Sequence, residues 1–105
     1  LRVLNYLRGE LAQPEPAVER WVRHWIGSGF AALEPLVRRH SADGRHCFGD
    51  SVTLADICLV PQMYNARRFG CELAALPSLV AVDAALCELP AFAAAVPERQ
   101  PDAPA

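Results

Sequence analysis

Apolar residues recur at helical spacing along most of the chain. Between residues 17 and 39 a large apolar residue returns every three or four positions, and charged residues fill most of the positions between. Shorter stretches with similar spacing occupy residues 1–8 and 77–87, and an alanine-rich stretch covers 91–96. This spacing is typical of helices, and no stretch alternates apolar and polar residues for long enough to form a strand. The pattern therefore predicts an all-α fold, an irregular helical bundle formed by residues 1–105 as one domain.

The longest predicted helix begins near Pro16 and carries two glycines, Gly27 and Gly29, in its interior. Each glycine costs about 1 kcal/mol relative to Ala in a helix. We therefore expect a structural reason, and the large neighbours favour close contact with another helix over a bend. The positions expected to face the core are Trp21, Trp25, Ile26, Phe30, Leu33, Leu36 and Val37, and those expected on the polar face include Glu19, Arg23, His24, Glu34 and Arg38.

A second helix is predicted from Thr53 to Phe69, and its start is the clearest in the chain. Thr53 followed three residues later by Asp56 makes a capping box, and Val52 with Ile57 has the spacing of a hydrophobic staple. The next residues are apolar on nearly all sides of the helix, which is typical of a buried helix. We expect this helix at the centre of the fold.

Pro61 divides the same helix, because it lacks a backbone donor and favours a kink or break. Beyond it, Pro61, Asn65 and Arg68 share one face. Arg67 and Arg68 are candidates for carboxylate binding, since arginine presents a planar fork of donors. The alternative is that they are solvated cations that stabilise the carboxyl end of the helix, which Gly70 should terminate.

The charge balance, 10 basic against 12 acidic residues, gives no general footprint for nucleic acid or an anionic membrane. No apolar run reaches the roughly 18 to 20 residues of a membrane span, and the first residues lack a signal-peptide core. We therefore expect a cytoplasmic protein. Three prolines in residues 97–105 predict an extended tail.

The four cysteines show no Cys-x-x-Cys spacing and the three histidines are scattered, so we expect free thiols and no metal site. His46 beside Cys47 suggests a thiolate pair, but adjacent side chains point in different directions and a structural role is favoured. Asp56 is explained by the capping box and not by acid catalysis. The cysteines are Cys47, Cys58, Cys71 and Cys87.

Several segments resemble one family. The stretch from Gly49 to Asp56 resembles the capping box in the C-terminal helical domain of cytosolic glutathione transferases. Three further segments are similar to the zeta class, the maleylacetoacetate and maleylpyruvate isomerases: residues 56–62, 65–69 and 99–102. The resemblance covers essentially the whole chain.

This resemblance implies a glutathione-dependent cis–trans isomerase acting on maleylacetoacetate or maleylpyruvate, a small dicarboxylate-like diketo acid. In the family the glutathione thiolate adds to the cis double bond, the resulting single bond rotates, and elimination gives the trans alkene. Arg68 matches the family arginine that pairs with a substrate carboxylate, and Asn65 would help shape that site. Arg67 and Gln62 match the motif without an assigned role.

The family's Ser-Ser-Cys segment and most of its glutathione site belong to an N-terminal thioredoxin-like domain, which these 105 residues do not contain. We therefore expect no catalytic residue here, no turnover by the chain alone, and a homodimer for the full-length protein. Two alternatives stay open. One is the same domain of another glutathione transferase, which conjugates electrophiles. The other is a non-catalytic helical interaction module, with a large exposed apolar patch and no pocket at Arg68.

Overall fold

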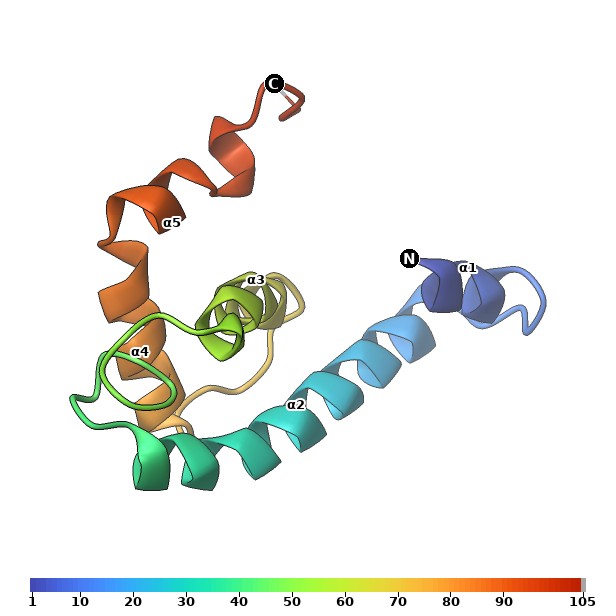
Figure 1. The fold of residues 1–105 in the computed structure, drawn as a ribbon. Helices are drawn as coiled ribbons and strands as arrows, with labels where there is room; N and C mark the ends of the chain where they lie inside the picture. Colours follow the sequence, from blue (N-terminus) through green and yellow to red (C-terminus); the bar gives the residue numbers. More distant parts are fainter. Residues whose placement is uncertain (105) are drawn as a thin grey trace.

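The fold is an open arrangement of helices, seen in a computed structural model that describes residues 1–104. Within these residues there is no strand, only an isolated bridge between Ser41 and Gly49, so the all-α prediction is confirmed. The helices are α1 (Arg2–Arg8), α2 (Glu15–His40), α3 (Leu54–Arg68), α4 (Pro77–Cys87) and α5 (Pro90–Ala94), followed by the 3₁₀ turn η1 (Pro97–Arg99) (Figure 1).

Helix α2 is the longest of the described helices, and α1 packs near its first turns (Figure 1). Helix α4 packs against both α2 and α3, and α5 continues from α4 toward the carboxyl terminus. No helix among the described residues is long and apolar enough to cross a membrane. The core lies between α2, α3 and α4 and is formed mainly by Val22, Ile26, Phe30, Val37, Leu59, Met63, Leu79, Val82 and Leu86.

The buried face of α2 differs in part from the predicted one, since Ile26, Phe30 and Val37 are buried as expected. Trp21 and Trp25 were expected in the core, but 37% and 55% of their surfaces are exposed, and Leu36 is also exposed. Each tryptophan lies one position before a buried residue, and one position turns the side chain by about 100° on a helix. The buried positions are Val18, Val22, Ile26, Phe30, Glu34 and Val37.

The expected close contact at Gly27 and Gly29 is also wrong. Helix α2 runs through both positions, and apart from the adjacent backbone of α2 itself, a Cβ atom added at either would meet no described atom within 4 Å. Neither glycine is needed for packing within this chain.

Glu34, expected on the polar face, is instead buried, with 5% of its surface exposed. Its carboxylate accepts hydrogen bonds from the backbone N–H groups of Ser78 (2.8 Å) and Leu79 (3.0 Å). Helix α4 begins at Pro77 and has no side-chain cap from its own preceding residue. Glu34 therefore caps α4 from a distant part of the chain and joins it to α2.

Helix α3 was expected to be buried on all sides, but only one stripe of it is buried. Leu54 and Cys58 are exposed, which corrects the expectation that Cys58 lies in the core. Val52 and Ile57 are each about half exposed, so the staple between them stays a prediction. The buried stripe consists of Asp56, Leu59, Met63 and Ala66.

The end of α3 follows the prediction. At Pro61, however, the break that the proline favours does not occur, and the helix continues to Arg68. Gly70 then adopts φ of +69°, a left-handed conformation that costs glycine little. Its N–H donates to the carbonyl of Arg67 (3.2 Å), and the N–H of Cys71 donates to that of Ala66 (2.8 Å). These bonds satisfy carbonyl groups that the helix leaves open.

The tail prediction is wrong in part, because Pro97–Arg99 forms a 3₁₀ turn. The side chain of Arg99 donates to the carbonyl of Ala93 (3.0 Å), and that of Gln100 donates to the carbonyls of Ala94 and Val96 (both 3.0 Å). The end of α5 thus finds partners in the residues that follow it. Ala105, also predicted extended, lies outside the described residues.

Candidate functional site

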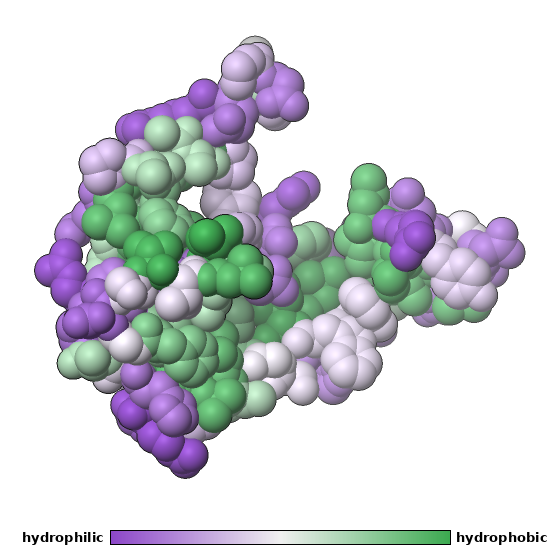
Figure 2. All heavy atoms as spheres, viewed as in Figure 1, coloured by the Kyte–Doolittle hydropathy of each residue, from purple (hydrophilic) through white to green (hydrophobic). Residues whose placement is uncertain are grey.

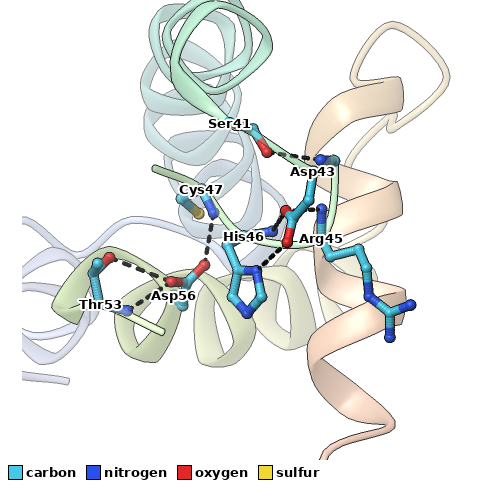
Figure 3. Close-up of polar contacts among 8 residues, drawn as sticks. Ser41, Asp43, Arg45, His46, Cys47, Thr53 and Asp56 are labelled. Carbon is cyan, nitrogen blue, oxygen red and sulfur yellow. Dashed lines mark hydrogen bonds and ion pairs between the residues drawn. The ribbon is translucent and has the colours of Figure 1, made fainter. Parts of the chain in front are cut away.

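The capping box at the start of α3 is confirmed, and its carboxylate has a further role (Figure 3). Asp56 is fully buried. Its Oδ2 accepts from the N–H (2.8 Å) and hydroxyl (3.3 Å) of Thr53, and its Oδ1 accepts from the N–H of Cys47 (2.8 Å). Burial alone would raise the pKa of Asp56, but these hydrogen bonds outweigh it and hold the pKa below its usual value. Asp56 is thus a structural carboxylate that fixes the preceding loop onto α3.

The loop before α3 contains no thiolate pair (Figure 3). His46 faces Asp43, with 2.8 Å between Nδ1 and Oδ2, and Oδ1 of Asp43 accepts from the N–H of Arg45 (2.8 Å). Cys47 is buried, and burial together with the neighbouring Asp56 raises its pKa to about 12. Since the thiolate is the reactive form, Cys47 is not a nucleophile at neutral pH.

The two arginines at the end of α3 have different surroundings. Nη2 of Arg67 lies 2.7 Å from Oδ2 of Asp83, a carboxylate that is 3% exposed on α4. Arg68 is exposed, and its guanidinium carbon lies 5.7 Å from the centre of the Phe69 ring. Among residues 1–104 no carboxylate is within ion-pair distance of Arg68. The fold therefore uses Arg67 internally and leaves Arg68 available to a ligand.

Beside these arginines, a groove of about 370 Å³ lies between α1, α2 and α3. Helix α3 and its end contribute Gln62, Asn65 and Phe69, and Nδ2 of Asn65 donates to Oε1 of Gln62 (3.2 Å). Figure 2 shows hydrophobic side chains over the middle of α2 and near the amino terminus. The rest of the lining is apolar: Leu1, Val3, Leu4, Trp21, Val22, Trp25 and Ile26.

The structure therefore brings Asn65 into the groove and leaves Arg68 outside its lining. Arg68 is linked to the groove through Phe69, because its guanidinium lies beside the Phe69 ring and Phe69 is a lining residue. The groove itself combines two amides with an apolar wall, and the cation of Arg68 lies next to one of its lining residues. Such a site can bind a small molecule that has an anionic end and an apolar body.

A second cavity, of about 380 Å³, lies where the end of α2 meets the start of α4. Arg38 and Ser41 contribute polar groups to it, and it contains none of the predicted site residues. In the part of the chain that the structure describes, no three His, Cys, Asp or Glu side chains are grouped to hold a metal ion.

Comparisons with known proteins identify relatives of this fold. No family model matches the chain. A probable maleylacetoacetate isomerase of Vibrio cholerae is 48% identical over 103 residues, which are 98% of this chain and 47% of that protein. A solved maleylpyruvate isomerase, described as a bacterial zeta-class glutathione transferase, superposes with a TM-score of 0.92 at 47% identity, covering 98% of this chain and 49% of the other. This chain is a relative of the zeta-class glutathione transferases.

A third zeta-class relative adds information on ligands. The maleylacetoacetate isomerase of Anaeromyxobacter dehalogenans was solved with dicarboxyethyl glutathione and citrate in its active site. It is 48% identical and superposes with a TM-score of 0.86. The match covers 98% of this chain and 46% of the isomerase chain. The chain thus spans about half the length of the zeta-class relatives it matches, as their C-terminal helical part.

Three features of the groove and its surroundings were missed from the sequence. Trp21 and Trp25 line the groove, although they were assigned to the core. Gln62 was assigned no role, but it lines the groove and accepts a hydrogen bond from Asn65. The pairing of Arg67 with Asp83 on α4 could not be predicted, because nothing in the sequence around either residue indicates it.

Proposed function

We propose that this chain forms the substrate side of a glutathione-dependent cis–trans isomerase that acts on maleylacetoacetate or maleylpyruvate, with Arg68 binding a substrate carboxylate. One observation carries the proposal. Of two adjacent arginines, Arg67 is held by the buried Asp83, while Arg68 has no acidic partner in the described residues and lies beside Phe69, which lines the groove. A carboxylate would find in Arg68 the planar pair of donors that suits it.

The groove residues fit a substrate more closely than a thiol cofactor. The lining offers amides from Gln62 and Asn65 and apolar side chains, but no hydroxyl, thiol or imidazole that could activate a thiol. Bound glutathione would supply the thiolate that adds to the cis double bond and leaves after rotation. This chain would bind the carboxylate end, hold the apolar body against the tryptophans and exclude water from that wall. We expect the purified 105-residue chain to show no glutathione-dependent turnover.

The proposal is tested by replacing Arg68 in a polypeptide in which this chain follows the amino-terminal half of the Vibrio cholerae relative. A hydrogen bond to a charged group contributes about 1.5–3 kcal/mol, so R68A should lower kcat/KM by roughly 10- to 150-fold. The loss should appear mainly in KM, because the carboxylate is bound both before and during the reaction. R68K should retain part of the affinity, as a point charge without the fork.

The matched control is Arg39→Ala, since Arg39 is an exposed arginine of α2 that takes part in no ion pair within residues 1–104. R39A should leave KM unchanged. Equal KM values for R68A and the parent protein would refute carboxylate binding by Arg68.

A second candidate function is conjugation of apolar electrophiles to glutathione, which the mostly apolar lining of the groove favours. That activity would not need a carboxylate on the substrate, so R68A would leave it intact. The interaction-module alternative is favoured by exposed apolar residues on α3, chiefly Leu54 and Ile57. It predicts that aspartate at these positions abolishes a partner complex but leaves turnover unchanged. We further propose a cytoplasmic homodimer for the whole protein, which sedimentation of that protein would test.

A further inference from the structure

The carboxyl-terminal segment brings a carboxylate to Tyr64, one helical turn before Arg68 on α3. Glu98, in η1, accepts a hydrogen bond at Oε1 from the hydroxyl of Tyr64, with 2.7 Å between the oxygens. Tyr64 and Arg68 are four residues apart on α3, so their side chains share one face of the helix. The hydrogen bond to Glu98 is the main cause that raises the pKa of Tyr64. The positive charge of Arg68 is near enough to act on Tyr64 in the opposite direction.

This hydrogen bond joins two otherwise separate parts of the chain. Arg99 and Gln100 attach the terminal segment to carbonyl groups at the end of α5, and α5 packs against α4. Among the side-chain hydrogen bonds of residues 1–104, the one from Tyr64 is what links this segment to α3. Figure 1 shows the segment rising away from α4, with its end well separated from α3.

Glu98 is ionised at neutral pH, as an exposed glutamate ordinarily is, and the hydrogen bond from Tyr64 holds its pKa below the usual value. Both side chains are exposed, so the bond is easily exchanged for water. A released glutamate side chain has several rotatable bonds and carries the same chemical group that a carboxylate ligand presents to Arg68. The chain therefore contains its own competitor for that arginine.

We propose that Glu98 and Tyr64 determine the specificity of the Arg68 site: Glu98 competes with carboxylate ligands for Arg68, and Tyr64 holds Glu98 away from it. This inference rests on the proposed role of Arg68. With Tyr64 in place, Glu98 weakens the binding of ligands with two negative charges more than those with one, through repulsion. Without the tyrosine hydroxyl, Glu98 pairs with Arg68 and excludes the ligand.

The test is titration of the ¹⁵N-labelled chain with malonate and with acetate at low ionic strength, followed by NMR shifts at Arg68 and the end of α3. Removing one charge several ångströms from the ligand should strengthen malonate binding about threefold in E98Q, with a smaller change for acetate. Y64F should weaken malonate binding about threefold. The double variant should behave as E98Q does, because without the charge there is nothing for Tyr64 to restrain.

The opposite signs separate this role from a structural one. If the hydrogen bond only held the segment in place, E98Q and Y64F would weaken binding together. The controls are E88Q and Y6F, which change an exposed glutamate and an exposed tyrosine with no side-chain hydrogen bond among the described residues.

Two results would overturn the proposal, and they differ. If R68A abolishes malonate binding but E98Q and Y64F shift it in the same direction or not at all, the competitor role is refuted and the Arg68 site stands. If no variant, E98Q included, shows malonate binding that depends on Arg68, the proposed function of Arg68 in this chain fails as well.

Discussion

Glu34 provides the sharpest test of how the fold is held together. Its carboxylate sits between α2 and α4 and accepts the N–H groups of Ser78 and Leu79, at 2.8 and 3.0 Å. In E34A both donors would lose this partner, and the N–H of Leu79 is buried. In E34Q the side-chain carbonyl could accept one bond, but the amide NH₂ would face the second donor. The two variants therefore remove different parts of one interaction.

The expected magnitudes follow from the hydrogen bonds. Hydrogen bonds to a charged group contribute about 1.5–3 kcal/mol each, and a helix-capping side chain usually contributes less than that. We therefore expect E34A to lower the free energy of unfolding by about 3 kcal/mol and E34Q to lower it by about 1.5 kcal/mol. Burial of Glu34 would raise its pKa, but the two N–H groups outweigh burial and hold the pKa below its usual value. A carboxylate with a lowered folded pKa stabilises the fold above its unfolded pKa of about 4.3 and loses that effect as the pH falls through the folded value.

Urea unfolding followed by circular dichroism at 222 nm measures both effects. The difference between wild type and E34Q should be full at pH 7 and should shrink below about pH 4. Other carboxylates also titrate there, but they are present in both proteins and cancel in the difference. E19Q is the control on the same helix, where an exposed pair with Arg23 at 3.6 Å should contribute less than about 1 kcal/mol. A stability difference that is the same at pH 7 and pH 3.5 would refute the role of the ionised carboxylate.

Three further predictions concern single positions. R67A should lower the free energy of unfolding measured in urea by about 2–3 kcal/mol, because it leaves the buried carboxylate of Asp83 unpaired. R68A should change it by less than about 0.5 kcal/mol. Equal losses in the two variants would contradict the different roles of the two arginines. G27A should stabilise by up to about 1 kcal/mol, since an added Cβ meets no atom of residues 1–104, and a loss in melting temperature would show a contact outside them. Iodoacetamide at pH 8, read by mass spectrometry, should modify the exposed Cys58 and leave Cys47, with its pKa of about 12, unmodified until the chain unfolds.

Local signals were sufficient to predict the elements of the fold. The capping box at Thr53 and the glycine at position 70 marked the ends of α3, and the helical spacing marked α2. These signals act through hydrogen bonds within a few residues, so the sequence carries them directly. Which face of each helix is buried depends on the partners, and there the prediction failed by one position at Trp21 and Trp25.

Polar contacts between residues far apart in the chain could not be predicted from the sequence. The cap on α4 comes from Glu34, 44 residues before Ser78, and the partner of Arg67 is 16 residues away on another helix. Nothing in the local sequence of either pair distinguishes them from solvated charges. For the same reason the local sequence did not show that Arg67 pairs with Asp83, although the family resemblance had already singled out Arg68.

The different roles of Arg67 and Arg68 follow from helix geometry. Adjacent side chains on a helix point about 100° apart, so when one of them faces α4, the other cannot. The bond to Asp83 then does more than stabilise the fold, because it fixes the rotation of the last turn of α3 about its own axis. That rotation also sets the direction of Asn65, which lines the groove, and of Arg68, which lies beside Phe69. Carboxylate binding by Arg68 would thus depend on an ion pair that no ligand touches, and loss of Asp83 should weaken binding even where the helix stays folded.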